Sequence, residues 1–140
     1  MQKKILLLTG TSGFIGHKFL SFALSNNFSV IDILRVKNKK NSKIIKLKKL
    51  YPKSYKNIFF SSNSDLSKKL EKINADYFIN FATLYSNNHS HNQISNFIES
   101  NILFPTLIYD IINNKINKMI NFGSMMQHSK NEKLVSNNLY

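Results

Sequence analysis

Three glycines divide the segment TGTSGFIG, residues 9–16, near the amino end of the chain. Glycine is needed where a chain turns sharply and where the backbone must come close to a ligand. We predict that Gly10 makes a turn, that Gly13 lets a diphosphate approach, and that Gly16 allows a helix to pack closely on a strand. A helix that starts here offers free N–H groups and the positive end of its dipole, and both attract phosphate. The predicted binding residues are Gly10, Thr11, Ser12, Gly13, Phe14, Ile15 and Gly16. The alternative is that this loop is a tight turn that binds no ligand.

The elements that must position this loop alternate along the chain. Short apolar or β-branched runs predict strands over residues 3–9, 29–36, 57–60, 76–81 and 118–122. Helical spacing of apolar residues and capping residues predict helices over 14–25, 44–50, 66–73 and 92–113. Ser64 and Asp65 are the expected caps of the third helix, and Pro105 is expected to bend the fourth.

This alternation predicts an α/β fold, a Rossmann-like doubly wound parallel sheet with strand order 3-2-1-4-5. The fifth strand would form an apolar sheet edge, which folded proteins normally pair or cover. We therefore expect a single domain over residues 1–140 that is truncated after the fifth strand. The length fits one domain with one core.

Composition excludes several classes of protein. The chain has no cysteine, so disulfides, thiolate nucleophiles and cysteine-based zinc sites are excluded. Its opening apolar run, residues 5–8, is too short to span a bilayer and lacks the features of a signal peptide. We expect a cytoplasmic protein with no membrane partner. His89 and His91 form a pair without a third ligand, so we expect no metal site.

The formal net charge of +13 raises the question of a nucleic-acid partner. Against that interpretation, Arg35 is the only arginine, whereas proteins that read base edges use several for bidentate contacts. The lysines are spread over loops and helix faces, as compositional bias predicts. We expect no nucleic-acid partner, and a basic surface that attracts phosphorylated small molecules.

The segment TGTSGFIG resembles the TGxxGFIG signature of extended short-chain dehydrogenases, the NAD-dependent epimerase/dehydratase family, and the resemblance covers the whole chain. It implies an NAD(P)-binding domain of an enzyme that acts on a nucleotide-activated sugar by hydride transfer. The stretch over residues 121–140 is most similar to the abequose-synthase-like branch, which reduces 4-keto deoxysugars attached to a nucleotide. The resemblance also implies that full-length relatives are homodimers and that their C-terminal substrate-binding part is absent here.

The end of the second strand determines the choice between NAD and NADP in such proteins, because an acidic side chain there binds the ribose 2′-hydroxyl and arginine binds a 2′-phosphate. The family pattern places Leu34 at the acidic position and Arg35 after it, with Lys37 nearby, which favours NADP. Asp32 supports the alternative, NAD, because it shares the face of Leu34, although it would lie about 7 Å deeper.

The resemblance assigns further cofactor contacts. Asp65 and Leu66 match the pair beside the adenine, where Asp65 accepts from the exocyclic amine or serves as a helix cap. Other family contacts are matched by Phe81, Ala82, Thr83 and Asn101. Thr83 departs from the family's usual alanine. Asn101 matches an asparagine that supports the active-site lysine and a water in related enzymes. The alternative is that Asn101 is an ordinary polar residue on a helix.

Catalysis in the family uses a tyrosine as general acid or base and a serine or threonine that binds the reacting oxygen. Tyr140 matches the tyrosine and Ser124 matches the serine or threonine. The alternatives are that Ser124 caps a loop and that Tyr140 is merely a terminal aromatic residue. A phenol with a pKa near 10 needs a nearby positive charge to ionise at neutral pH. The lysine of the family's YxxxK pattern would follow Tyr140, so we expect little turnover from this chain alone. A non-catalytic NAD(P)-binding module is the alternative function.

Overall fold

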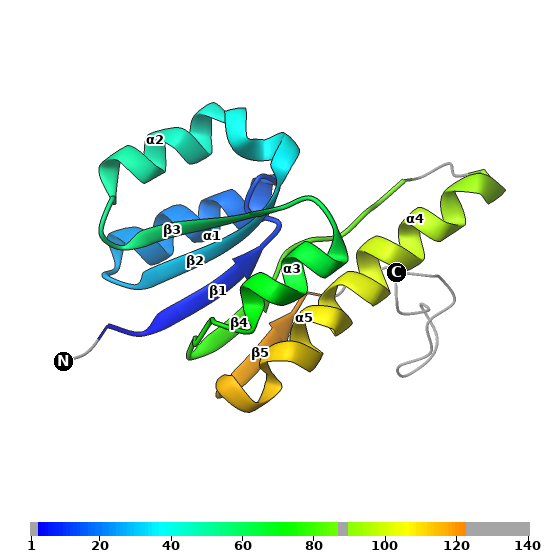
Figure 1. Cartoon of the computed structure of the whole chain (residues 1–140). Helices are drawn as coiled ribbons and strands as arrows, with labels where there is room; N and C mark the ends of the chain where they lie inside the picture. The colour runs from blue at the N-terminus through cyan, green and yellow to red at the C-terminus, as the bar shows by residue number, and fades with distance from the viewer. Residues whose placement is uncertain (1–2, 87–89, 123–140) are drawn as a thin grey trace, which may run out of the picture.

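The computed structural model describes residues 3–86 and 90–122. Its centre is a five-stranded parallel sheet in the order β3-β2-β1-β4-β5 (Figure 1). The strands are β1 (Ile5–Thr9), β2 (Ser29–Arg35), β3 (Tyr55–Phe60), β4 (Tyr77–Asn80) and β5 (Lys118–Asn121). The predicted fold class and strand order are therefore confirmed.

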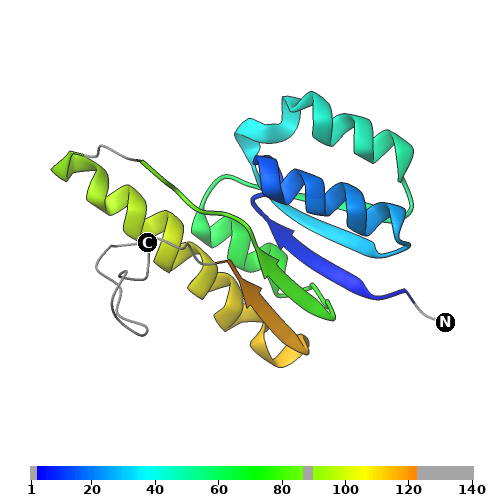
Figure 2. The same cartoon turned by 180° about the vertical axis from the view of Figure 1, so that it is seen from behind.

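Helices cover both faces of the sheet. The α-helices are α1 (Phe14–Ser25), α2 (Ser42–Leu50), α3 (Asn63–Leu70), α4 (Ile94–Ile98) and α5 (Phe104–Ile112). Short 3₁₀ turns occupy Val36–Lys40, His91–Gln93 and Asn113–Lys115. In Figure 1 α3 and α5 lie in front of the sheet, and the reverse view in Figure 2 shows α1 and α2 on the other face.

Alternation along the central strands divides the core into two layers, because successive side chains of a strand point to opposite faces. Leu7 packs with Phe78 and with the apolar residues of α3 and α5. Its neighbours Leu6 and Leu8 pack under α1 and α2. Burial on both faces explains why the first strand reads as a continuous apolar run.

The third helix begins earlier than predicted. Its N-cap is Ser62, whose hydroxyl accepts a hydrogen bond from the Asp65 N–H at 3.2 Å, rather than Ser64 or Asp65. Ser62 has the extended backbone that a cap requires, with φ −146° and ψ 164°. The prediction placed the cap too late because several adjacent residues are good caps by type.

The predicted fourth helix is present, but it changes geometry in the middle. A π-helical turn over Glu99–Leu103 connects α4 to α5, and Pro105 lies in the first turn of α5. Proline has no N–H to donate to the preceding turn, so the widened turn accommodates it. Such turns are frequent at functional sites.

The far edge of the sheet is open in the described part of the chain, as expected. No strand there pairs with the outer side of β5. Ile120 on β5 is 41% exposed, and Phe122 just after it is 53% exposed. Within residues 3–86 and 90–122, none of the helices has the length and apolarity needed to cross a bilayer.

Positive charge is concentrated rather than spread evenly. Ten of the 20 lysine and arginine residues lie within residues 33–64, a stretch without any Asp or Glu. This stretch contains the end of β2, the first 3₁₀ turn, α2 and β3. We refer to it as the basic segment.

Candidate functional site

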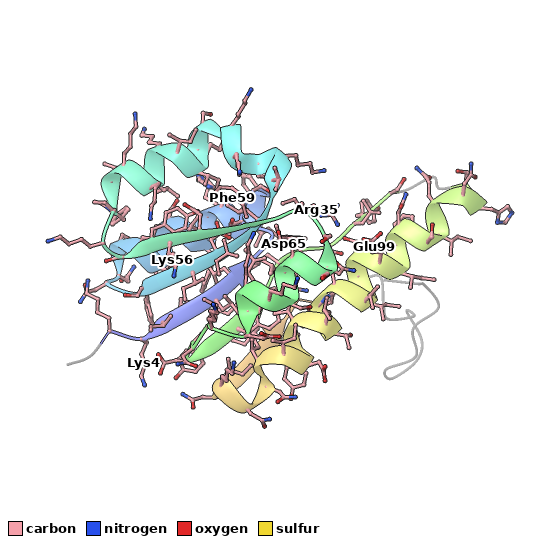
Figure 3. The ribbon with its side chains drawn as sticks, viewed as in Figure 1. Lys4, Arg35, Lys56, Phe59, Asp65 and Glu99 are labelled. Carbon is pink, nitrogen blue, oxygen red and sulfur yellow. The ribbon has the colours of Figure 1, made fainter. Side chains whose placement is uncertain are left out.

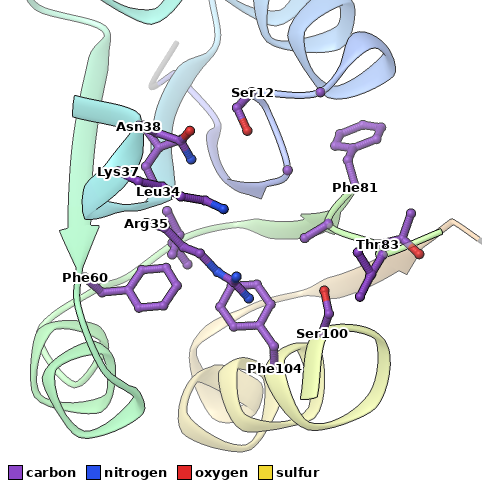
Figure 4. Close-up of a pocket in the computed structure, with 15 residues that line it drawn as sticks. Ser12, Leu34, Arg35, Lys37, Asn38, Phe60, Phe81, Thr83, Ser100 and Phe104 are labelled. Atoms are coloured by element: carbon purple, nitrogen blue, oxygen red, sulfur yellow. The ribbon is translucent and has the colours of Figure 1, made fainter. Parts of the chain in front are cut away.

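A pocket of about 280 Å³ opens at the carboxyl ends of the strands (Figure 4). It is lined by the loop after β1, the end of β2, the end of β3, the segment after β4 and the π-helical turn. Strand order reverses between β1 and β4, and ligands of open α/β sheets bind at such a switch point. The pocket therefore lies where this topology places a ligand.

Gly10 is required by the fold. Its φ is +72°, a conformation that L side chains rarely adopt. A Cβ at this position would lie 2.4 Å from the backbone N of Ala82, so the loop packs directly on the segment after β4.

Gly16 is required for a different contact of the same loop. A Cβ there would lie 2.4 Å from the carbonyl oxygen of Gly10. The close approach at Gly16 is thus between α1 and the loop that follows β1, rather than between the helix and the strand itself. The close contacts at Gly10 and Gly16 therefore fix the position of the loop between α1 and the segment after β4.

Gly13 lines the pocket and is under much weaker internal constraint. A Cβ there would meet only the Gly10 carbonyl oxygen, at 3.3 Å, and would otherwise stand in open space. The contacts within the protein therefore constrain position 13 less than positions 10 and 16. The space that Gly13 leaves open suits a ligand that must approach the backbone.

The first turn of α1 has N–H groups that no side chain caps, and these can bind an anion. Gly13 is its N-cap and provides no side-chain hydrogen bond, and the first turn contains no acidic residue. By contrast, the N–H groups of α2 are capped by Asn41 and those of α3 by Ser62. Uncapped N–H groups and the positive dipole end together favour phosphate.

Arg35 and Lys37 provide the positive charge at the rim. Both line the pocket and an adjoining cavity of about 530 Å³. Figure 4 shows the Arg35 side chain directed into the pocket, toward the rings of Phe60 and Phe104. These two rings are stacked, with centroids 5.5 Å apart. The rim combines cationic and aromatic surface, which suits a nucleotide.

Asp32, the predicted competitor of Arg35, is buried away from the pocket. Its carboxylate accepts hydrogen bonds from the Thr11 hydroxyl at 2.6 Å and the Tyr55 hydroxyl at 2.5 Å. Leu34, at the family's acidic position, belongs to the core under α1 and α2. Arg35 is thus the ionisable side chain of β2 that reaches the pocket.

Burial raises the pKa of Asp32 to about 6, although the bonds from Thr11 and Tyr55 lower it. The folded protein therefore binds this proton more tightly than the unfolded chain, in which the pKa is near 4. The stabilising contribution is fully present below pH 4 and is lost as the pH rises through 6. This difference in pKa corresponds to about 3 kcal/mol.

We therefore predict that Asp32→Asn removes a pH-dependent loss of stability. Urea unfolding between pH 4.5 and 7.5 will show the wild type losing about 2 kcal/mol relative to the variant, because part of the contribution is already lost at pH 4.5. Other titrating groups are common to both proteins and cancel in the comparison. Parallel pH profiles for the two proteins would contradict the prediction.

Asp65 and Leu66 lie beside the pocket region but do not line it. The Asp65 carboxylate accepts from the Ser61 N–H at 3.1 Å and pairs with Lys69 at 2.8 Å, and these partners lower its pKa. Leu66 is fully buried in the core. Figure 3 shows Arg35, Asp65 and Glu99 at the same end of the sheet. The residues that line the adjoining cavity here are Ser61, Ser62 and Asn63.

Phe81, Ala82 and Thr83 line the pocket, as the resemblance implies for cofactor contacts. Asn80 fixes the start of this segment, because its side-chain oxygen accepts hydrogen bonds from the Thr9 hydroxyl and from the Ala82 N–H. Its amide nitrogen donates to the Asn121 side chain on β5 at 2.7 Å. Asn80 is not among the predicted site residues, and its signal in the sequence is a polar residue at the end of an apolar strand.

Asn101 holds the next part of that segment. Its side chain accepts from the Leu84 N–H at 2.7 Å and donates to the Leu84 carbonyl at 3.0 Å. The Thr83 hydroxyl donates to the same amide oxygen at 3.3 Å. Asn101 therefore clamps the loop after β4 to the π-helical turn.

The structure also brings residues to the pocket that the sequence analysis missed, namely Asn38, Phe60, Leu84, Ser100 and Phe104. Ser100 lies on the π-helical turn, for which Pro105 is the only signal in the sequence.

Some predicted site residues lie elsewhere. Phe14 and Ile15, predicted as contacts, are 80% and 65% exposed on the first turn of α1 and do not line the pocket. Ser124, Tyr140 and His89 lie outside the described residues. In the part that is described, no three His, Asp or Glu side chains are grouped to hold a metal ion.

The family model described as "NAD dependent epimerase/dehydratase family" matches residues 6–138. No curated protein matches the sequence at a significant level.

Solved structures share the fold at low sequence identity. A protein from Burkholderia multivorans described as a short-chain dehydrogenase/reductase, with bound NADP, superposes with a TM-score of 0.81 at 15% identity. That match covers 99% of this chain and 66% of the other. A second protein from the same organism, described as a short-chain alcohol dehydrogenase, gives 0.80 at 15% identity, covering 99% of this chain and 70% of the other. UDP-glucose 4-epimerase from Bifidobacterium longum, in complex with NAD+ and UDP, gives 0.76 at 18% identity, covering 94% of this chain and 40% of the other.

Proposed function

The chain belongs to the NAD dependent epimerase/dehydratase family, and from this premise we propose that it binds NADPH in the pocket at the switch point between β1 and β4. The single observation that carries the proposal is the open space at Gly13, beside the uncapped first turn of α1. A dinucleotide diphosphate has the charge and the need for close backbone approach that fit this space.

The remaining lining residues fit the rest of a dinucleotide. Arg35 and Lys37 would hold the 2′-phosphate, because guanidinium and ammonium groups bind phosphate oxygens strongly. Asp32 is unavailable to a ribose, since its carboxylate is buried and bound by Thr11 and Tyr55. These two facts favour NADPH over NADH.

When bound, a nicotinamide supplies hydride exchange with a substrate carbon. We propose that Tyr140 moves the matching proton at a substrate oxygen and that Ser124 orients that oxygen by hydrogen bonding, as the family resemblance implies. Phe81, Ala82 and Thr83 would form one wall of the cofactor site, kept in place by Asn80 and Asn101.

We propose a nucleotide-activated sugar as the substrate, with a 4-keto deoxysugar as the specific class from the similarity of residues 121–140 to the abequose-synthase-like branch. The solved epimerase is a complex with UDP, which is consistent with this class. We further propose a cytoplasmic location, a second copy of the same protein as partner, as the resemblance implies for its full-length relatives, and no nucleic-acid partner.

Isothermal titration calorimetry tests the choice of cofactor. We predict that NADPH binds more tightly than NADH and that Arg35→Ala weakens NADPH about tenfold, the effect of one lost charge-assisted contact. NADH affinity should change little in the same variant. Lys56→Ala is the matched control, because exposed Lys56 belongs to the same basic segment and lines neither cavity.

Two outcomes count against the proposal. Equal affinity for both cofactors, or equal losses in the two variants, would remove the assignment of the 2′-phosphate to Arg35. Absence of binding by either dinucleotide to a folded sample would remove the proposed function itself.

A further inference from the structure

Thr11 belongs to the glycine-rich loop, yet its side chain turns away from the pocket. The side chain is fully buried, and its hydroxyl donates to Oδ2 of Asp32 at 2.6 Å. Ser12, the next residue, is exposed and lines the pocket instead. The loop is therefore anchored from behind by Thr11, while its pocket side remains open.

The acceptor of this bond is held firmly. Asp32 lies in the middle of β2 and is fully buried. The Tyr55 hydroxyl of β3 donates to the same oxygen at 2.5 Å. Within the described part of the chain, Oδ1 of Asp32 has no hydrogen-bond partner. A buried carboxylate is costly unless it is well bound, so these two hydroxyls are its main compensation.

This arrangement links the loop to the sheet across three neighbouring strands. Thr11 follows β1, Asp32 is on β2 and Tyr55 begins β3. An ionised carboxylate can only accept hydrogen bonds, so the Thr11 hydroxyl must point its proton toward Asp32. Bonds to a charged acceptor are shorter and stronger than neutral ones. The orientation of the Thr11 backbone is thereby restrained immediately before Ser12 and Gly13.

We propose that Thr11 and Asp32 are positioning residues, whose hydrogen bond sets the conformation in which the glycine-rich loop receives the dinucleotide diphosphate. The inference rests on the proposed function. It assigns to Thr11 a role through Asp32 rather than a direct contact with the cofactor.

Calorimetric titration with NADPH of the full chain and three variants tests the proposal. Thr11→Val keeps the shape of the Thr11 side chain and leaves the Asp32 carboxylate in place, but it removes the hydrogen bond between them. It should weaken NADPH binding about tenfold. Thr11→Ser keeps a hydroxyl and should regain most of the affinity. Tyr55→Phe is the matched control, because it removes the other hydroxyl from the same carboxylate oxygen without touching the loop. Its NADPH affinity should fall much less than that of Thr11→Val, because the hydrogen bond from Thr11 to Asp32 remains.

Thermal unfolding of each variant separates positioning from stability. Thr11→Val and Tyr55→Phe should both lower the melting temperature, whereas only the former should lower affinity. If Thr11→Val does not fold, Thr11→Ala repeats the test with a smaller side chain.

The outcomes distinguish this inference from the proposed function. Wild-type affinity in folded Thr11→Val, or equal losses in Thr11→Val and Tyr55→Phe, would overturn the positioning role. A folded wild type that does not bind NADPH would overturn the proposed function instead.

Discussion

Gly10→Ala will lower the free energy of unfolding by about 3 kcal/mol or more, the sum of a strained positive φ and an overpacked contact. The new Cβ would lie 2.4 Å from the backbone at Phe81 and Ala82, which cannot move aside like a flexible side chain. Asn80 also holds that backbone, because its side-chain oxygen accepts a hydrogen bond from the Ala82 N–H. Urea unfolding followed by circular dichroism at a fixed pH measures the loss.

Gly13→Ala is the control for this prediction. Gly13 has φ −81° and ψ 171°, an extended conformation open to any residue, and its nearest contact would be 3.3 Å. We expect that variant to lose less than about 1 kcal/mol. Equal losses at Gly10 and Gly13 would mean that the loop does not pack on the segment after β4 as described.

Gly13→Val will retain the fold and lose NADPH binding by about a hundredfold, equivalent to roughly 3 kcal/mol. The physical reason is occupancy, because the valine side chain would fill the open space that the diphosphate needs. Valine also tolerates the extended backbone at this position. Calorimetry with NADPH measures the affinity, and urea unfolding verifies the fold.

Gly13→Ala serves as a second comparison for the binding prediction. Its single methyl group should reduce the NADPH affinity less than the valine side chain does. A folded Gly13→Val protein with wild-type affinity would show that the diphosphate does not approach this glycine. The first two glycine predictions are thus independent, because one concerns stability and the other concerns binding.

Much of the fold could be predicted because the local signals agree with one another. The helix over Phe14–Ser25 was predicted to the residue, and every strand was found within two residues of its bounds. Continuous apolar runs, glycines and asparagines marked these elements. The glycine-rich loop and the end of the second strand, both predicted to bind the cofactor, lie at the carboxyl edge where this topology has its switch point.

The parts that could not be predicted depend on contacts between segments distant in sequence. Asp32 reads as a polar residue on a strand, and only Tyr55 from β3 and Thr11 from the loop make it a buried acceptor. Asn101 likewise reads as a helix polar group until its contacts with Leu84 are known. Such pairings arise from tertiary packing, which no local pattern encodes.

The basic segment has a consequence for how an anionic ligand arrives. Arg35 and Lys37 stand at the mouth of the pocket and belong to a stretch of ten cations with no acidic residue. A field of one sign extends beyond contact, over a Debye length of about 8 Å at physiological ionic strength. It increases the rate of productive encounters, whereas the residence time depends on short-range bonds to the loop and to Arg35 and Lys37. Added salt should therefore slow the capture of a dinucleotide more than it speeds its release, because screening weakens the long-range field more than bonds made in contact.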